Sequence, residues 1–498
     1  MSIVWNFPAI SILLCLFAGI VSSGLSGKSA RRLNTVLMIT VLVLSAATLK
    51  FTATLGESVV YVMGKFPAPW GNELRFGVLE AGMATFFAVI MILSMLGGHH
   101  KLDEEVEQRQ HNLYYVLVDL LLSSLLALLY TNDIFTAYVF VEINTIAACG
   151  LIMIRGIGRT IEAAVRYMIM SLIGSGMLLM GICILYDITG QLLMSHMKTS
   201  IAGLIVDGEY PVALLVSISL ICVGLAIKSA LFPFHAWLPD AYGYSTVSSA
   251  AILSSLVSKG YIFLLIKIIY RVIGFNIFNN SDIIDILFVF GLAGMIFGSV
   301  NAIRENDVRR MIAYSSVAQI GYIYMGIGMG TQFGMIAAIF HILCHAATKS
   351  LLFVSAIGLT DVSGYNRQFI YMTGSGYRHK FAGVAFTVGS LSMVGVPLFA
   401  GFISKLLFAE SAVRLSGSKM LPGLIVLGIS TILNAIYFMK TVIRIYTPAP
   451  DSPYQTIKAR TIRPYCVVLV LFIAVNLVLG CMSDGIVELI KQGLIMFG

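Results

Sequence analysis

Residues 333–359 read FGMIAAIFHILCHAATKSLLFVSAIGL and decide the fold class. The run exceeds the about 20 apolar residues that a helix needs to cross a bilayer. Three titratable side chains interrupt it at i, i+4 and i+8, a spacing that aligns them on one helical face about 6 Å apart: His341, His345 and Lys349. The stretch therefore predicts a membrane-spanning helix that carries a titratable stripe, which resembles a relay more than a packing stripe.

The composition extends this prediction to the whole chain. Of 498 residues, 58% are hydrophobic and only 11% are charged, less than half of the about 25% charged residues typical of soluble domains. This excludes a soluble enzyme, a disordered chain and a nucleic-acid-binding protein. The seven cysteines form no CxxC pair, and no phosphate-binding glycine loop is present. We therefore expect no cofactor, no metal, no redox centre and no ATP-driven step in this chain.

Long apolar runs between polar or Gly/Pro-marked breaks predict an all-α integral membrane protein with about fourteen spans. The seventh and twelfth are expected to be interrupted, by Pro233 and by Gly395, Pro397 and Gly401. The N-terminus lacks a basic signal region and is interpreted as the first retained span. The predicted ranges are 8–24, 33–49, 78–97, 113–130, 133–154, 167–187, 211–232, 247–266, 283–302, 311–329, 333–359, 381–410, 420–439 and 464–482.

The basic residues predict the orientation. An even number of spans places both termini on one side. Nineteen of the 32 Lys and Arg residues fall in loops on the opposite side, nine fall on the side of the termini, and four lie inside spans. Because basic loops stay cytoplasmic, we expect a multi-pass protein of the cell membrane with both termini outside.

Three landmarks recur at nearly one offset and predict an internal repeat. The pair Asn132-Asp133 recurs as Asn306-Asp307, and Ala163-Ala164 recurs as Ala337-Ala338 at the same separation in sequence. The pair Gly224–Lys228 recurs as Gly401–Lys405 at a slightly larger separation. The offset covers five spans, an odd number, so the second copy enters the membrane from the opposite side. Such inverted repeats are typical of secondary transporters, whose sites lie near the midplane on interrupted helices.

Ionisable side chains inside spans are the candidate functional groups, since each lysine or acid at a helix centre costs about 2.5–3.5 kcal/mol on insertion scales. Inside the membrane these groups must be paired with an opposite charge, hydrated, or partly neutral. Each of these conditions also allows a side chain to take part in ion transfer. The groups are Lys228, Lys259, Lys349, Lys405, Glu80, Asp119, Glu142, Glu410, His341 and His345.

Several of these groups allow more than one interpretation. Glu142 and Lys228 are expected to form an ion pair. Lys259, at the centre of the eighth span, is expected to have a functional role. A zinc site is the weaker alternative for the two histidines, because no Cys or carboxylate ligand is near. For Glu80 a structural and a functional role are equally open; Asp119 could face a neighbouring chain, and Glu410 is expected to be solvated. His235, in the Pro-bracketed stretch 232–240, belongs either to a plain loop or to an unwound segment beside the ion path.

Five motifs together resemble the antiporter-like membrane subunits shared by Mrp-type cation/proton antiporters, respiratory complex I and membrane-bound hydrogenases. They cover roughly residues 60–445 in the family's order. The motifs are NDIFTAYVFVE (132–142), LFPFHAWLPD (231–240), DVRRMIAYSSVAQIG (307–321), HxxxHAxxK (341–349), and GxP with GFxxK (395–405).

The resemblance implies fourteen helices with two inverted five-helix repeats, and a midplane proton path. By motif position, Glu142 and Lys228 would form the switching pair and Lys259 the central carrier. His341 and His345 would bridge to Lys349 and Lys405, which lead to the far end or to the next subunit. A lysine at 405 and the lack of a long C-terminal arm favour a mid-sized antiporter subunit of the Mrp or hydrogenase kind. Two departures from the family pattern, the missing prolines in 241–250 and the missing aspartate in the third span, leave the ion specificity open.

The sequence thus predicts a proton-translocating subunit in a larger complex. Its expected partners are other membrane subunits, H⁺, with Na⁺ or K⁺ as candidate exchanged ions, and lipid, but no nucleic acid. Whether a quinone or hydrogenase module drives the complex stays open. An autonomous solute symporter and a non-conducting scaffold are the alternatives. The expected division is an N-terminal part (1–112), a first repeat (113–270), a second repeat (283–446) and a C-terminal loop with the last helix (447–498).

Overall fold

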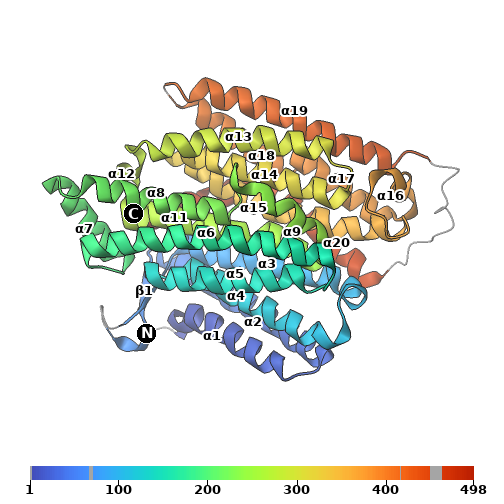
Figure 1. The fold of residues 1–498 in the computed structure, drawn as a ribbon, viewed down its shortest axis with the longest axis horizontal. Helices are drawn as coiled ribbons and strands as arrows, with labels where there is room; N and C mark the ends of the chain where they lie inside the picture. Colours follow the sequence, from blue (N-terminus) through green and yellow to red (C-terminus); the bar gives the residue numbers. More distant parts are fainter. Residues whose placement is uncertain (1–2, 67–70, 416, 449–461, 498) are drawn as a thin grey trace.

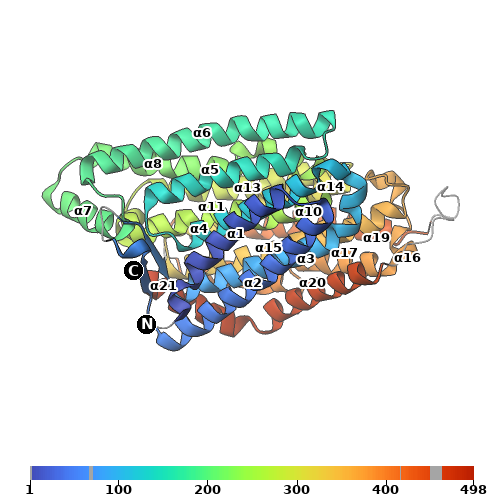
Figure 2. The same cartoon turned by 90° about the horizontal axis from the view of Figure 1, so that it is seen from below.

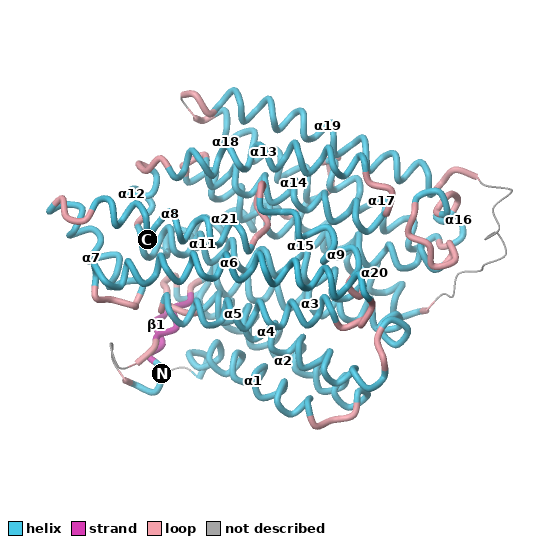
Figure 3. Tube along the Cα trace, viewed as in Figure 1, coloured by secondary structure: helices cyan, strands magenta, loops and turns pink. Residues whose placement is uncertain are grey.

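The computed structural model describes residues 3–66, 71–415, 417–448 and 462–497, which form a helical bundle with one small β-hairpin. The helices run roughly along one common direction, horizontal in Figure 1, and Figure 3 shows how little of the described chain is loop. Both chain ends lie at the same end of the bundle in the two perpendicular views of Figures 1 and 2. The predicted loop that begins at 447 falls largely on residues 449–461, outside the described residues.

The α-helices have these bounds: α1 (Phe7–Ser23), α2 (Gly27–Leu55), α3 (Val78–Glu105), α4 (His111–Tyr130), α5 (Ile134–Met153), α6 (Gly158–Thr189), α7 (Met194–Asp207), α8 (Pro211–Lys228), α9 (Leu238–Tyr244), α10 (Val247–Ile252), α11 (Ser258–Ile268), α12 (Phe275–Asn279), α13 (Ile283–Arg304), α14 (Val308–Gly328), α15 (Gln332–Asp361), α16 (Ser375–Arg378), α17 (Lys380–Val394), α18 (Ala400–Val413), α19 (Met420–Ile445), α20 (Arg463–Cys481) and α21 (Ser483–Phe497). The shorter elements are the 3₁₀ turns η1 (Ile3–Asn6), η2 (Met63–Lys65), η3 (Gln108–Gln110), η4 (Phe234–Trp237) and η7 (Phe369–Tyr371), the π-helical segments η5 (Leu253–Val257) and η6 (Ile269–Ile273), and the antiparallel strands β1 (Val59–Val62) and β2 (Glu73–Phe76).

Twelve helices of the described chain are long and apolar enough to cross a membrane. They correspond to twelve of the fourteen predicted ranges, so an all-α, multi-pass membrane protein is confirmed. The range 311–329 is the helix α14, whose Ser, Gln and Tyr residues lower its apolar character. The range 381–410 is divided into the two shorter helices α17 and α18.

Both predicted interruptions are present in the structure. Helix α8 ends at Lys228, and the chain continues through a turn and η4 into α9. Helix α17 ends at Val394 and is followed by Gly395, whose φ of +91° is a left-handed conformation that favours glycine. In each case the helix break lies beside a lysine of the repeated Gly–Lys pair, Lys228 or Lys405.

The eighth span extends further than predicted. It runs from Val247 through two π-helical segments to Ile273 and is buried throughout its most apolar window. Lys267 and Arg271, which the charge pattern assigned to a loop, therefore lie inside this helix at 0% and 1% exposure. That assignment was wrong because the helix continues past the two charges, which are satisfied by partners inside the protein.

The central helices are completely enclosed by the others. α15 is fully buried in its most apolar window, like the eighth span, whereas α1 and α19, at opposite edges of Figure 1, bury only 39% and 33% of theirs. In Figure 2, α6 and α8 form one edge of the bundle and α20 the other. The titratable stripe of α15 therefore lies in the centre of the protein, away from lipid.

The repeated Asn-Asp pairs occupy matching local structures. Asp133 caps α5 by accepting a hydrogen bond from Thr136 N at 2.6 Å, and Asp307 caps α14 by accepting one from Arg309 N at 2.8 Å. Each aspartate also forms an isolated antiparallel bridge, Asp133 with Leu193 and Asp307 with Gln368. One bridged segment leads into α7 and the other through η7 to α16. Helices α7 and α16 lie at opposite ends of the bundle (Figure 1).

Candidate functional site

The predicted pair of Glu142 and Lys228 is formed between α5 and the last residue of α8. Lys228 Nζ lies 3.5 Å from Glu142 Oε1, and the lysine side chain is fully buried while the glutamate side chain is 26% exposed. Lys228 Nζ also donates to Thr145 Oγ1 at 2.8 Å and lies 5.6 Å from the centroid of the Tyr261 ring. Ser175 donates a short hydrogen bond to Glu142. Besides α5 and α8, which carry the pair, helices α6 and α11 thus contribute contacts to it.

Close helix packing positions Lys228. A Cβ on Gly224 would lie 2.6 Å from the carbonyl oxygen of Gly174, and a Cβ on Gly174 would lie 3.2 Å from Lys228 Cγ. Only glycine at both positions lets α6 and α8 approach this closely. The ammonium group also stands at the carboxyl end of α8, where the helix dipole favours a cation.

Lys259 lies two residues after the first π-helical segment. Its Nζ donates a short hydrogen bond to the carbonyl oxygen of Ser254 and a second one to Ser258 Oγ at 3.3 Å, and the residue is 0% exposed. A π-turn leaves a backbone carbonyl without its usual i+4 partner. The helix itself therefore supplies acceptors to a lysine that has no carboxylate partner among the described residues.

His341 and His345 lie as predicted on one face of α15. Their rings are stacked with centroids 5.9 Å apart and planes 5° from parallel. His341 Nδ1 is 2.6 Å from Ser404 Oγ, whereas His341 Nε2 and both ring nitrogens of His345 are buried with no hydrogen-bond partner among the described residues. Three unpartnered ring nitrogens are a costly arrangement unless water or a proton donor reaches them.

Lys349 and Lys405 extend this polar region in two directions. Lys349 Nζ donates to the carbonyl of Ile312 at 2.8 Å and makes a short hydrogen bond to Ser315 on α14. Lys405 Nζ donates to the carbonyl of Val394 at 2.7 Å, at the break between α17 and α18. It also lies 5.7 Å from the centroid of Tyr322.

A small cavity of ≈ 10 Å³ joins the two histidines to Lys405. This volume is of the order that a single water molecule needs. Its polar lining includes Gln319, whose Nε2 is buried and has no partner among the described residues. The sequence prediction missed Gln319, although it stands at the repeat offset from Thr145, which contacts the other lysine of the repeat.

The remaining membrane acids are explained by local partners. Glu80 forms an ion pair with Arg271 at 2.5 Å, each side chain being 1% exposed, and accepts a hydrogen bond from Gly77 N. Asp119 accepts from Asn34 at 2.5 Å and from Ser22 at 3.2 Å, so it is buried between α1, α2 and α4 and does not face a neighbouring chain. That alternative was wrong, because both partners come from the chain itself.

Glu410 and His235 lie apart from these groups. Glu410 pairs with Arg414 at 2.5 Å on an exposed helix face, with side chains 47% and 50% exposed, as expected for a solvated acid. His235 lies in η4 and stacks on Phe232 with centroids 5.4 Å apart. Lys267, which the prediction missed, donates to the carbonyls of Leu128, Leu129 and Thr131 and so caps the end of α4.

In the described part of the chain, no group of three or more His, Cys, Asp or Glu side chains is arranged to hold a metal ion. The zinc alternative for His341 and His345 therefore lacks a third ligand there. The fold and these contacts define a multi-pass membrane protein in which Lys, Glu and His side chains are buried among central helices.

Comparison with known proteins identifies the class more closely. Residues 131–432 match the family model described as NADH:quinone oxidoreductase/Mrp antiporter, TM. The NADH-quinone oxidoreductase subunit N of Desulforudis audaxviator is 33% identical over 415 residues, 83% of this chain and 81% of that protein. A putative antiporter subunit mnhD2 of Staphylococcus aureus is 29% identical over 70% of this chain and 68% of its own.

Two solved structures share the fold. The membrane-bound sulfane sulfur reductase, an archaeal respiratory membrane complex, contains a chain with a TM-score of 0.88 and 24% identity, covering 100% of this chain and 98% of that one. The Mrp complex from Dietzia sp. DQ12-45-1b contains one with a TM-score of 0.87 and 23% identity, covering 99% and 97%. The protein belongs to the NADH:quinone oxidoreductase/Mrp antiporter membrane family and is an antiporter-like membrane subunit.

Proposed function

We propose that this subunit translocates protons through its buried Glu, Lys and His side chains, within a complex of several membrane subunits. The observation that carries the proposal is the Glu142–Lys228 pair, in which a fully buried ammonium lies 3.5 Å from a partly exposed carboxylate. At this distance the pair stabilises both charges, yet one added proton on the carboxylate would release the lysine. Such a pair has two electrostatic states that a proton can select.

The other groups support a path that starts at this pair. Lys259, Lys349 and Lys405 are each bound to backbone carbonyls or hydroxyls, partners that accept from a charged lysine without fixing its charge as a carboxylate would. The two histidines between them have three ring nitrogens free of partners in the described chain. In the proposed path Lys259 is the central carrier, His341 and His345 bridge, and Lys349 and Lys405 lead onward.

The inverted repeat belongs to the same proposal. We interpret 113–270 and 283–446 as two five-span units of a fourteen-span fold. The matching caps and bridges at Asp133 and Asp307 support this interpretation, since two independent segments have the same backbone arrangement at the repeat offset. Thr145, which binds Lys228, and Gln319, which lines the cavity with Lys405, stand at the same offset and are a second parallel.

The size of the central cavity does not favour the symporter alternative. A small-molecule site occupies about 300–1,000 Å³, whereas the cavity beside His341 and Lys405 is ≈ 10 Å³. Water and protons fit this space, and a solute does not. Whether Na⁺ or K⁺ exchanges for the proton is decided by the transport assay below.

The test is proton transport by the whole complex in inverted membrane vesicles. Glu142→Gln and Lys228→Ala should each abolish ΔpH formation while the complex still assembles, as judged by its size on native gels. Glu410→Gln, which changes an exposed acid, and Lys440→Ala, which changes an exposed lysine, are the matched controls and should transport normally. Full transport by either test variant would refute the proposal and support the scaffold alternative. Repeating the assay with Na⁺ or K⁺ gradients identifies any exchanged cation.

The orientation is tested separately. We propose that both termini lie outside and that the basic loops are cytoplasmic; the common end of the bundle that holds both termini is consistent with this (Figures 1 and 2). A cleavable tag at the C-terminus should be removed by protease added to intact spheroplasts. Protection of the tag until lysis would reverse the orientation.

A further inference from the structure

A large cavity lies at the end of the bundle opposite the chain termini. Its volume is ≈ 340 Å³, within the range of sites that hold small ligands. It opens where α3 ends, where α14 begins and where the eighth span starts at Val247. Its charged lining consists of Lys101, Glu104, Glu105, Arg155, Arg309 and Arg367.

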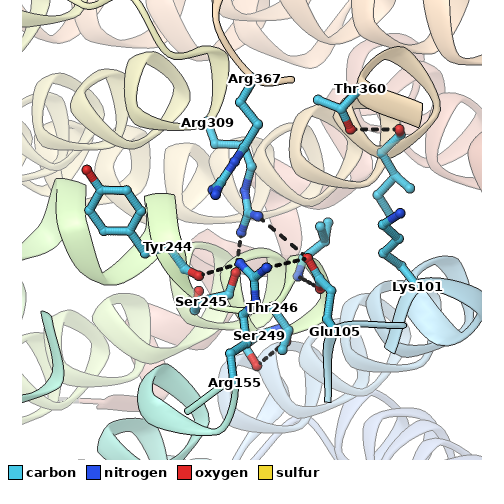
Figure 4. A network of polar contacts seen from close by, with 12 residues as sticks. Lys101, Glu105, Arg155, Tyr244, Ser245, Thr246, Ser249, Arg309, Thr360 and Arg367 are labelled. Atoms are coloured by element: carbon cyan, nitrogen blue, oxygen red, sulfur yellow. Dashed lines mark hydrogen bonds and ion pairs between the residues drawn. The ribbon is translucent and has the colours of Figure 1, made fainter. Parts of the chain in front are cut away.

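Three guanidinium groups from separate parts of the chain converge there, as Figure 4 shows. Arg155 comes from the α5–α6 turn, Arg309 from the first turn of α14, and Arg367 from the segment after α15. Each donates to a backbone carbonyl of the short stretch 243–245: Arg155 to Tyr244 at 2.9 Å, Arg309 to Ser245 at 2.6 Å, and Arg367 to Gly243 at 2.6 Å. These neutral acceptors position the groups without cancelling their charge.

The carboxylates that line the cavity do not balance its basic side chains. Lys101 is already paired with Glu104 at 2.6 Å and with Asp361 at 2.9 Å. Of the two carboxylates that line the cavity, Glu105 faces the arginines, at 3.9 Å from Arg155 and 4.0 Å from Arg309, and its other oxygen accepts from Val247 N at 3.0 Å. Among the side chains that line the cavity, four are basic and two are acidic, so the lining itself carries an excess of two positive charges.

Arg309 shows most clearly that a partner is missing. The residue is 3% exposed, and its Nε has no hydrogen-bond partner among the described residues. In the adjacent turn, burial lowers the pKa of the Arg155 guanidinium; the Glu105 carboxylate opposes this shift, and the charge of Arg367 adds to it. A buried cation without full compensation is strongly destabilising, so an added anion would stabilise the folded protein.

We propose that this cavity is a binding site for a phosphate-class anion, held by Arg155, Arg309 and Arg367. Planar guanidinium groups bind phosphate oxygens in bidentate fashion and stay charged at every relevant pH. The phosphate group could belong to a free ion or to the headgroup of an anionic lipid.

Thermal unfolding of the purified full-length chain tests the proposal. Inorganic phosphate, compared with chloride at matched ionic strength, should raise the melting temperature with a saturable dose dependence. In Arg309→Gln and Arg367→Gln the apparent affinity should fall at least about tenfold, since each variant loses a charge-assisted hydrogen bond. Arg367→Lys should retain part of the effect. Arg109→Gln, whose side chain is 91% exposed, is the matched control and should behave as wild type.

A second arm of the experiment distinguishes the source of the phosphate. Nanodiscs of phosphatidylcholine with or without phosphatidylglycerol replace the free ion. Stabilisation by phosphatidylglycerol alone, lost in the arginine variants, identifies a lipid headgroup; stabilisation by inorganic phosphate alone identifies a free ion. If neither stabilises the wild type, or if the arginine variants respond equally, the proposal is overturned. If Arg309→Gln does not fold, the comparison of Arg367→Gln with Arg367→Lys tests the proposal instead.

Discussion

Lys228 and Glu142 lie 3.5 Å apart, but the protein shields them unequally. The lysine side chain is 0% exposed and the glutamate side chain 26%. The positive half of the pair is thus enclosed by the chain itself, while the negative half borders the outer surface of α5. Removal of one partner or the other therefore has different consequences.

We predict that Glu142→Gln destabilises the protein more than Lys228→Met. Glutamine leaves a buried ammonium without its counter-charge. Because the Glu142 side chain is 26% exposed, we expect a loss below the about 3–5 kcal/mol of a fully buried pair. Methionine leaves a partly exposed carboxylate that water can reach. Thermal unfolding in detergent compares the variants. The double variant should regain part of the loss; an additive loss would mean that the two side chains do not interact.

The second prediction compares two ion pairs of equal length. Glu80–Arg271 and Glu410–Arg414 both measure 2.5 Å, but the first is 1% exposed on both sides and the second about half exposed. Glu80→Gln should lower the free energy of unfolding by about 3–5 kcal/mol, and Glu410→Gln by less than about 1 kcal/mol. Similar melting temperatures for the two variants would contradict the buried environment of Arg271.

Helix capping by the repeated aspartates gives a third prediction. Asp133→Ala and Asp307→Ala should each cost about 1 kcal/mol, because each removes the acceptor for backbone N–H groups at a helix start. Asn is an equally good cap, so Asp133→Asn and Asp307→Asn are the controls and should unfold like the wild type. A loss in the Asn variants as large as in the Ala variants would point to a role of the charge itself.

The close packing of α6 on α8 gives a fourth prediction. Gly224→Ala places a methyl group 2.6 Å from the Gly174 carbonyl oxygen, so we expect a loss of about 1–3 kcal/mol. Gly176→Ala on α6 has no heavy atom within 4 Å of the new Cβ and should be neutral or slightly stabilising. Yield of folded monomer on size exclusion and melting temperature measure both; equal behaviour would refute the packing argument.

The helices could be predicted because hydrophobic length alone specifies a span. The twelve apolar helices correspond to predicted ranges, and the breaks at Pro233 and Gly395 follow from residues that end helices. The stacking of His341 on His345 follows from their i, i+4 spacing. The hairpin β1–β2, the helix α7 and the C-terminal helix α21 were missed, since each is short or amphipathic.

The charges at the far end of the eighth span could not be predicted for a different reason. Lys267 and Arg271 stand at the end of an apolar run. In a sequence, charged residues at that position also mark the start of a loop. Only the tertiary structure shows that Lys267 binds the last carbonyls of α4. It also shows that Arg271 forms an ion pair with Glu80 and packs against the ring of Phe497. These partners lie on elements far away in the chain, and no local pattern encodes such pairings.

The π-helical turn before Lys259 has a geometric consequence for this helix. A π-turn contains one residue more than an α-turn at the same advance, so everything after Val257 is rotated by one residue position, about 100°, relative to an unbroken helix. Lys259 therefore faces the direction in which an uninterrupted helix would present residue 258. Deleting one residue within 253–257 would let the turn become regular α-helix, and Lys259 would keep the same neighbours. Inserting a residue elsewhere in the span would rotate Lys259 away from them.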